Sequence, residues 1–252
     1  MSTPFSTPLI GTAGWSISSA AASHFPADGS HLQRYAQVLD CVEINSSFYR
    51  PHQPATYARW AASVPESFRF SVKLPRRITH ELRLRDCSAE LERFAAEVMQ
   101  LENKLGCVLV QLPPSLRFEA DVAATFLSAL RQRFDGMLAC EARHASWFAA
   151  PATALLMERR ITRVRADPAA GQPGPHVPTT DAAYLRLHGS PRIYYSDYGA
   201  EYLAALAKAL HPPVRADSWC IFDNTAAGAA LLNALDLQAR LQARQPRMNA
   251  TT

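Results

Sequence analysis

The stretch CVEIN, residues 41–45, has the two-residue alternation of a β-strand, but only one of its faces is apolar. Val42 and Ile44 form one face and Cys41, Glu43 and Asn45 form the other, because successive side chains of a strand point to opposite sides of the sheet. A strand that served stability alone would carry Val or Ile at these polar positions. The stretch therefore predicts a strand with helices on one side and a polar surface on the other, running into the turn SSFYR (46–50).

Seven further strand-like runs occur along the chain: LIGTAG (9–14), FRFSVKL (68–74), CVLVQL (107–112), MLACEAR (137–143), ITRVRAD (161–167), AYLRLH (183–188) and WCIFDN (219–224). Amphipathic stretches with helical spacing separate most of them, which indicates a parallel sheet. Eight strand–helix units in 252 residues predict a TIM barrel, (β/α)8. The alternative is an open doubly wound sheet, but such a sheet more often stops at five or six strands, and no G-x-G-x-x-G follows the first strand.

One unit is irregular. Between the sixth and seventh strands, PAAGQPGPHVPTTDAA (168–183) contains four Pro and two Gly, which predicts a loop in place of the helix. No linker divides the chain. We therefore expect a single TIM-barrel domain over residues 1–252, with the barrel at about 9–241 and short flexible tails at both ends.

The alternation seen in CVEIN recurs in seven strands, and we assign each apolar face to the surrounding helices. The polar faces then point into the barrel, with four acids (Glu43, Glu141, Asp167, Asp223) and six bases (Arg69, Lys73, Arg143, Arg163, Arg165, Arg186). Because bases outnumber acids, a bound anion is the simplest way to balance the charge. The alternative is an internal ion network, above all for residues early in the strands such as Arg69, Arg163 and Arg165.

Several segments together resemble a known family, the TIM-barrel proteins called domain of unknown function 72, or YecE-like. The matching stretches are GTAGW (11–15), VEINSSFYR (42–50), FRFSVKLPRRITH (68–80), VLVQLPPS (108–115), EARHASW (141–147), YLRLHG (184–189), YYSDY (194–198) and FDNTAAGAALLNA (222–234). The resemblance implies a (β/α)8-like barrel and no established activity. After GTAGW the family continues with further aromatic residues, whereas this chain has SISSAAASHFP (16–26), so an aromatic wall in the first loop would rest on Trp15 alone.

The candidate site residues lie at the C-terminal ends of the strands and in the loops that follow, where TIM-barrel sites are found. We predict catalytic roles for Glu43, Glu141 and His188. The predicted substrate-binding residues are polar strand-end positions, a loop histidine and a rim of aromatic side chains: Asn45, Lys73, Gln111, Arg143, Arg186, Asp223, Asn224, His80, Trp15, Tyr49, Trp147, Tyr194 and Tyr198.

Three kinds of chemistry compete for these residues. A glycosidase would use Glu43 and Glu141 as its two carboxylates, although common barrel glycosidases, by resemblance, place acids after strands four and seven, where this chain has Gln111 and His188. A single divalent metal ion would bind oxygen and nitrogen ligands from Glu43, Glu141, His188, Asp223 and His80, but no H-x-H or H-E-x-x-H spacing occurs. Lys73, the only lysine on a predicted strand, would form a Schiff base or pair with Glu43 or Glu141.

The fourth kind of chemistry is the one we predict. A small phosphorylated or carboxylated anion would be held by Arg143, Arg186 and Lys73, and His188 or Glu43 would move the proton. The sequence shows no motif for an organic cofactor. A non-enzymatic or phosphodiesterase-like alternative stays open, in which LPRRITHELRLR (74–85) contacts the phosphates of a nucleic acid.

Composition bounds the partners and the compartment. The chain has 48% hydrophobic and 19% charged residues and a net charge of +4, without a long basic run that would indicate a nucleic-acid tail. Five cysteines without a CxxC pair favour a reducing cytosol. No signal peptide or transmembrane stretch is evident. We therefore expect a cytoplasmic protein, a monomer or small homo-oligomer without membrane contact, whose partner is a small anionic ligand.

Overall fold

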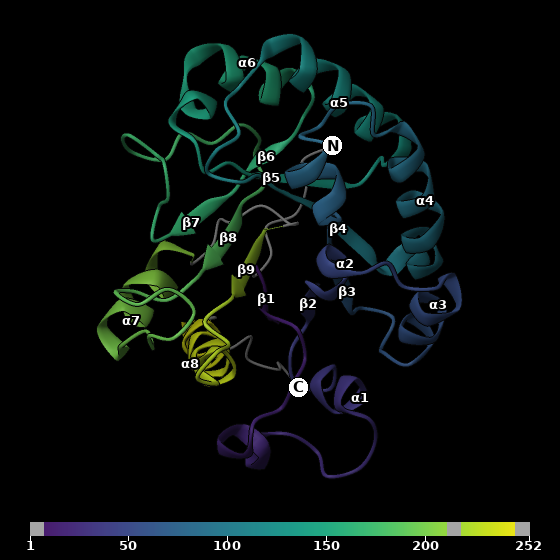
Figure 1. The fold of residues 1–252 in the computed structure, drawn as a ribbon. Helices are drawn as coiled ribbons and strands as arrows, with labels where there is room; N and C mark the ends of the chain where they lie inside the picture. The colour runs from purple at the N-terminus through teal and green to yellow at the C-terminus, as the bar shows by residue number, and fades with distance from the viewer. Residues whose placement is uncertain (1–7, 211–217, 245–252) are drawn as a thin grey trace, which may run out of the picture.

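The computed structural model describes residues 8–210 and 218–244, and its centre is a sheet of nine parallel strands (Figure 1). Their order is β6-β5-β4-β3-β2-β1-β9-β8-β7. The strands are β1 (Leu9–Ala13), β2 (Cys41–Ile44), β3 (Arg69–Lys73), β4 (Leu105–Gln111), β5 (Met137–Glu141), β6 (Thr162–Arg163), β7 (Arg165–Asp167), β8 (Tyr184–Leu187) and β9 (Trp219–Phe222). The predicted tails fall largely in residues 1–7 and 245–252, outside the described part of the chain.

The sheet curls into a barrel whose two edge strands are consecutive in the chain. β6 pairs with β5 and β7 pairs with β8, and Val164 alone stands between them. The continuous segment from β6 through Val164 to β7 therefore joins the β5 side of the sheet to the β8 side and closes the barrel. The eight predicted strands become nine because the sixth is interrupted at Val164. The prediction of a TIM-barrel-like fold is confirmed.

Helices alternate with the strands and lie outside the sheet (Figure 1). They are α1 (His31–Tyr35), α2 (Ser46–Tyr49), α3 (Pro54–Ala62), α4 (Ser88–Val98), α5 (Ala120–Arg133), α6 (Ala150–Glu158), α7 (Ala200–Ala209) and α8 (Ala229–Arg244), with shorter turns at Ser19–His24, Arg77–Glu81, Met99–Lys104 and Ala145–Phe148. In α4, Leu91, Phe94 and Val98 fall on one face and are buried, as helical spacing requires. Residues 168–183 form no helix, as predicted.

The buried apolar residues form two layers. The larger layer lies between the sheet and the helices and includes Val42, Ile44 and Phe70. The smaller one fills the lower interior of the barrel, with Tyr184 stacked on Trp219 at 5.9 Å between ring centroids. Because this lower layer is apolar and filled, the charged inward residues are confined to the C-terminal end of the barrel.

The inward assignment is wrong for the sixth strand. Arg163 donates to the carbonyl of Trp147 and the hydroxyl of Thr153 on α6, so its side chain points outward, whereas Val164 belongs to the barrel interior. Asp167 likewise points outward and accepts from Tyr202 on α7. The alternation itself is intact. The apolar face was assigned to the helices, but on this strand the outer polar side chains find hydrogen-bond partners on α6 and α7, and Val164 packs in the barrel interior.

Two further predicted bases lie away from the other inward charges. Arg165, on the outer face of β7, is exposed. Arg69 stands at the N-terminal end of β3, where its guanidinium donates to the carbonyls of Glu66 and Phe68. Both therefore leave the set of inward charges at the C-terminal end.

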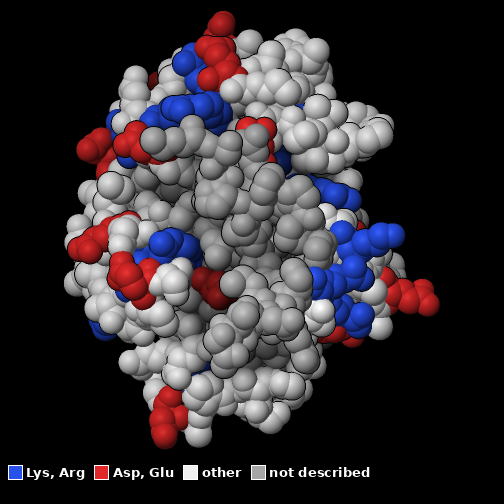
Figure 2. All heavy atoms as spheres, turned by 180° about the vertical axis from the view of Figure 1, so that it is seen from behind, with Lys and Arg blue, Asp and Glu red and all other residues white. Residues whose placement is uncertain are grey.

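The surface of the molecule mixes both signs of charge. Figure 2 shows Lys and Arg side chains at the margins of one face, with Asp or Glu side chains near them. All five cysteines are buried and free, as expected for small core residues. Within residues 8–210 and 218–244, no helix is long and apolar enough to cross a membrane.

Candidate functional site

Arg186, on β8, is the centre of a charged cluster at the C-terminal end of the barrel. Its Nε and Nη2 donate to the two oxygens of Glu43 at 3.0 and 2.6 Å. Nη2 also donates to Asp223 Oδ2 at 3.0 Å, and Nη1 donates to Glu141 Oε2 and, at 3.4 Å, to Gln111 Oε1. A guanidinium has five N–H donors, so these five contacts use all of them. Arg186 is fully buried and has no donor left for a ligand.

Glu43, at the end of β2, is held from two sides. Both of its oxygens accept from Arg186, and Oε2 also accepts from the hydroxyl of Tyr184 at 2.7 Å. The Tyr184 hydroxyl lies 2.8 Å from Ser71 Oγ. Because the Glu43 side chain has no exposed surface, its role in this arrangement is to orient and neutralise Arg186.

Glu141, at the end of β5, and Asp223, just after β9, complete the acidic side of the cluster. Burial acts to raise the pKa of each carboxyl, but Arg186 and His188 outweigh it and hold both pKa values below their usual range, that of Glu141 far below. Arg143 also lowers the pKa of Glu141, to whose Oε1 its Nε donates at 2.8 Å. Both carboxylates therefore stay ionised at neutral pH.

His188 lies between these two carboxylates. Its Nδ1 is 3.0 Å from Asp223 Oδ2, and its Nε2 is 3.2 Å from Glu141 Oε1 without the geometry of a hydrogen bond. Burial acts to lower the pKa of His188, but Asp223 and Glu141 reverse the effect and raise it. The imidazole edge meets the ring of Tyr194 at 5.9 Å between centroids. His188 is therefore a group that carries a proton at a pH where an ordinary histidine has lost it.

Lys73, at the end of β3, differs from the other charged groups of the cluster. Its residue is 7% exposed, and its Nζ lies 4.1 Å from the centre of the Phe48 ring. Within the described residues, Nζ makes no hydrogen bond and no ion pair, so the alternative of a direct pair with Glu43 or Glu141 is not realised. Burial, followed by repulsion from Arg186, lowers the pKa of Lys73 to about 8.

Arg143 and His80 lie on the outer side of this cluster. Arg143 Nη2 is 2.7 Å from Glu141 Oε1, and its side chain is 18% exposed. His80 is 2.8 Å from the Thr79 hydroxyl, and burial together with the charges of Lys73 and nearby arginines lowers its pKa. Its ring contacts that of Phe48 at 5.0 Å.

The Pro/Gly-rich loop 168–183 supports this outer side. Gly171 has φ +70°, and a Cβ at this position would lie 2.1 Å from the main-chain oxygen of Arg143. Only glycine permits so close an approach. The loop that replaces a helix therefore packs against the segment that positions Arg143.

Three of the predicted rim aromatics serve the packing of the fold. Trp15 packs edge-on against Trp60 at 5.0 Å. Trp147 is buried and donates through its indole N–H to a main-chain carbonyl at 3.0 Å. The Tyr198 hydroxyl accepts from the amide of Gly189 at 2.9 Å, and its ring is buried. The structure does not bring these three into contact with the Arg186 cluster.

The other two rim aromatics differ from each other. Tyr194 contacts His188 and lies beside Arg143, so it adjoins the cluster. Tyr49 is 79% exposed and contacts only the neighbouring ring of Phe48 among the aromatic side chains described.

The predicted amides also separate. Gln111 reaches Arg186, as described above. Asn224 donates to the carbonyl of Ser196 at 3.0 Å and to Asn233 at 2.9 Å, and so holds the loop after β8 to α8. Asn45 Oδ1 is buried and has no hydrogen-bond partner in the described part of the chain.

Sequence reasoning missed three residues of the cluster. Phe48 turns toward Lys73, whereas its neighbour Tyr49, which was predicted, turns outward. Both lie on the one-turn helix α2, and no periodicity distinguishes them over so short an element. Ser71 and Tyr184 were assigned inward, and an inward tyrosine hydroxyl needs a partner. The need of the Tyr184 hydroxyl for a partner was therefore the one sequence feature that could have predicted its hydrogen bond to Glu43.

The charge balance of the cluster differs from the prediction. Without Asp167, Arg69, Arg163 and Arg165, three acids face three bases, so the counted excess of bases is absent from the described cluster. The guanidinium of Arg186 occupies the point on which the three carboxylates converge. Among the described residues, no group of three or more His, Cys, Asp or Glu side chains is arranged to hold a metal ion. This donor set does not fit the divalent ion considered from the sequence.

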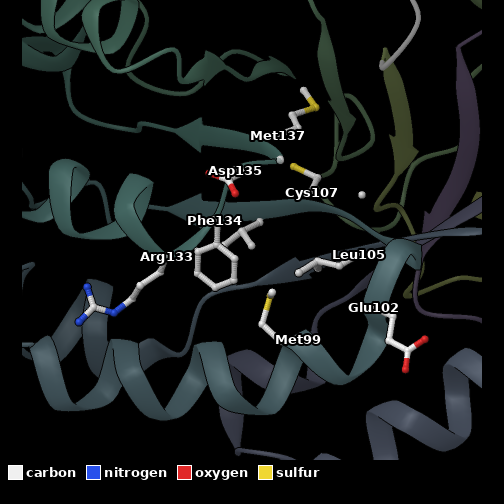
Figure 3. A pocket seen from close by; sticks show the side chains of 11 residues that line it. Met99, Glu102, Leu105, Cys107, Arg133, Phe134, Asp135 and Met137 are labelled. Carbon is white, nitrogen blue, oxygen red and sulfur yellow. The ribbon is translucent and has the colours of Figure 1, made fainter.

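A separate cavity lies at the other end of the barrel (Figure 3). It has a volume of about 170 Å³ and is lined at the N-terminal ends of β4 and β5 by residues such as Leu105, Met137 and Phe134. TIM-barrel sites lie at the opposite end. The Arg186 cluster, together with Lys73, Arg143, His80 and Tyr194, is therefore the candidate functional site.

The fold and the site define a TIM-barrel protein with a charged cluster at the C-terminal mouth. A family model described as "Protein of unknown function DUF72" matches residues 9–252, and the chain belongs to this family. The chain is 31% identical to the UPF0759 protein YecE of Escherichia coli (strain K12) over 119 residues, 47% of this chain and 43% of YecE. It is 30% identical to YunF of Bacillus subtilis (strain 168) over 148 residues, 56% of this chain and 52% of YunF.

These alignments span about half the length of the curated relatives. Over a longer range, the crystal structure of a DUF72 family protein from Thermotoga maritima MSB8 matches with a TM-score of 0.77 and 27% identity, covering 94% of this chain and 100% of that one. The family name states no activity, so the activity has to be argued from the site.

Proposed function

We propose that the protein is an enzyme that uses acid–base chemistry on a small carboxylated or phosphorylated substrate bound at the C-terminal mouth of the barrel. One observation carries the proposal. Lys73 has a largely buried side chain whose ammonium group makes no hydrogen bond and no ion pair among the described residues, next to a cluster whose carboxylates are already engaged. A cation with little access to water and no acceptor is unfavourable, and an anionic ligand would offset that cost.

The two sides of the cluster have different tasks in this proposal. The inner side consists of Arg186 and the three carboxylates that form ion pairs with it. These groups neutralise one another and form the floor of the site. The outer side consists of Lys73 and Arg143, whose cationic groups face the end at which a ligand would arrive. A carboxylate or phosphate suits both, because guanidinium and ammonium groups donate well to such oxygens.

His188 is better suited than Glu43 or Glu141 to move a proton. Glu43 is enclosed by Arg186 and Tyr184, and the pKa of Glu141 is held too low for it to bind a proton near pH 7. The raised pKa of His188 favours its protonated, proton-donating form, and the lowered pKa of Lys73, about 8, gives its neutral, proton-accepting form a larger share than in an ordinary lysine. Two groups whose pKa values are pushed toward neutrality from opposite sides suit an acid–base pair.

The nucleic-acid alternative receives less support from the segment 74–85. Arg77 pairs with Glu81 at 3.2 Å, and Arg85 pairs with Glu119 at 2.6 Å. Arg83 donates to the main-chain carbonyl of Ser115. Three of the four arginines in this segment thus bind groups of their own chain, and charges of both signs share the surface in Figure 2.

A thermal-shift panel tests the proposed function. The ligands are phosphate, pyruvate, lactate, succinate and a single-stranded oligonucleotide, each at low and at moderate salt. A ligand at one hundred times its Kd stabilises by about 2.7 kcal/mol, which for a domain of this size raises Tm by roughly 5–11 °C. We expect small anions to stabilise the protein and the oligonucleotide to have no effect beyond weak, salt-sensitive binding.

Substitutions identify the site responsible. Lys73→Met and Arg143→Met should abolish the anion-induced shift, whereas Lys208→Met, on the exposed face of α7, should preserve it. The proposal is wrong if no small anion stabilises the protein, or if Lys73→Met and Arg143→Met both keep the full shift.

A further inference from the structure

We propose that Lys73 forms a covalent imine with the carbonyl carbon of a small oxo acid whose carboxylate is held by Arg143. This inference rests on the proposed function, since it uses the same site, and it narrows the substrate class from small anions to those with an aldehyde or ketone group. The observation behind it is the setting of the Lys73 amine, which differs from that of the chain's other buried lysine.

Lys104 shows how a structural lysine is satisfied in this fold. It is 8% exposed, its Nζ donates to the carbonyls of Ala61 and Val64 at 2.8 and 2.9 Å, and Glu66 lies 3.7 Å away. Lys73 is buried to the same degree, at 7% exposure, yet the described residues offer its amine only the face of the Phe48 ring. Because no acceptor holds its proton, the Lys73 ammonium loses a proton more readily than that of Lys104, and its lone pair is then available to react.

Burial, followed by the charge of Arg186, outweighs the three nearby carboxylates and shifts Lys73 toward the neutral amine. Arg186 lies close enough to repel a second positive charge, and Phe48 excludes water from one side. The proton that the ammonium loses passes to solvent, because His80, whose pKa is lowered by burial and then by the charge of Lys73, is a weaker base than the amine. Desolvation and neighbouring cations are the two means by which proteins activate amine nucleophiles.

The covalent step balances without an added oxidant or reductant. The lone pair of Nζ forms a bond to the carbonyl carbon, and the carbonyl oxygen takes a proton from His188. The nitrogen of the resulting carbinolamine gives one of its protons to the hydroxyl, the hydroxyl leaves as water, and the nitrogen becomes a protonated imine. The iminium then accepts the electron pair of a bond on the carbon next to the imine carbon, so that carbon more readily loses a proton, or loses a carboxylate as carbon dioxide.

The net charge of the site is the same before and after these reaction steps, once His188 has regained its proton from solvent. Before attack, the carboxylate of the oxo acid pairs with Arg143. After dehydration, the iminium nitrogen carries the positive charge that the ammonium had carried before. The site thus has the same net charge with the covalent intermediate as with protonated Lys73 and a bound anion.

Reductive trapping tests the imine directly. The full chain is incubated with pyruvate or glyoxylate, sodium borohydride is added, and the protein is digested and mapped by mass spectrometry. The chain contains three lysines, Lys73, Lys104 and Lys208, so the position of an adduct is unambiguous. At pH 7 an amine with a pKa of about 8 has roughly two hundred times the neutral fraction of an ordinary lysine. We expect more than tenfold higher labelling of Lys73 than of the exposed Lys208.

Matched variants separate the imine from anion binding. Lys73→Arg retains a positive charge but cannot form an imine, so it should lose the adduct while keeping a pyruvate-induced thermal shift. Lys104→Arg and Lys208→Arg should keep the adduct. The imine is refuted if Lys73 is not labelled above Lys208. If pyruvate and lactate still stabilise the protein in that case, the proposed function survives without the imine, and if neither does, both fail.

Discussion

Replacing Arg186 with methionine would leave three buried carboxylates without their common partner. The side chain is fully buried, and its five donors reach Glu43, Glu141, Asp223 and Gln111. Removing one member of a buried ion pair typically costs about 3–5 kcal/mol. For a domain of this size, that corresponds to a fall in Tm of roughly 6–20 °C. We therefore expect Arg186→Met to fold with a much lower unfolding free energy at neutral pH.

The loss should also depend on pH, with a definite sign. In the unsubstituted protein the pKa values of Glu141 and Asp223 are depressed, so their stabilisation is present above the pKa of the unfolded chain and is lost as the pH falls through the folded pKa. In the variant, burial without Arg186 acts to raise these pKa values, so stability falls as the pH rises. The difference in unfolding free energy should therefore be larger at about pH 8 than at about pH 4.5.

Urea unfolding at these two pH values measures the effect, with Arg163→Met as the matched control. Arg163 is also buried, but its partners are the carbonyls of Val177 and Trp147 and the hydroxyl of Thr153. Its loss should destabilise the protein by the same amount at both pH values. Equal losses for Arg186→Met at the two pH values would refute the assignment of Arg186 as the counter-ion of the carboxylates.

Three further substitutions probe the surroundings of the cluster. Tyr184→Phe removes a hydroxyl that donates to a buried carboxylate and should lower the urea-unfolding free energy by about 1–3 kcal/mol; an unchanged midpoint would contradict this. Asp223→Asn removes a carboxylate that raises the pKa of His188, so an NMR titration should give a lower pKa, and an equal or higher one would count against the pairing. Gly171→Ala should increase amide hydrogen exchange in residues 168–183, whereas Gly174→Ala, which has open space around its Cβ position, should not; equal exchange in both would exclude the tight contact.

The period of two along each strand was enough to predict which residues face the interior. Glu43, Lys73, Glu141, Arg186 and Asp223 all lie on the inner side of the barrel, as the alternation required, and their positions late in the strands place them at its C-terminal end. The rule failed on the sixth strand because it took every helix-facing surface to be apolar, whereas Arg163 and Asp167 form hydrogen bonds to α6 and α7.

The pairing within the cluster could not be predicted in the same way. Alternation gives the side on which a residue lies, but which acid meets which base depends on the register between strands far apart in the sequence, such as β2 and β8. The sequence therefore left Lys73 with a choice between an ion pair and a reactive amine. The three-dimensional structure shows Arg186 bonded to all three nearby carboxylates and no direct ion pair of Lys73 among the described residues; the reactive amine is our proposal.

The position of a bound anion tests the central claim most directly. Crystals of the protein soaked in selenate, whose selenium scatters anomalously, would show where a tetrahedral anion binds. We predict an anomalous peak within hydrogen-bonding distance of Lys73 Nζ and the Arg143 guanidinium, and its absence from crystals of Lys73→Met. A map with selenate bound elsewhere on the surface and none at the mouth of the barrel would contradict the claim that this cluster is an anion-binding site.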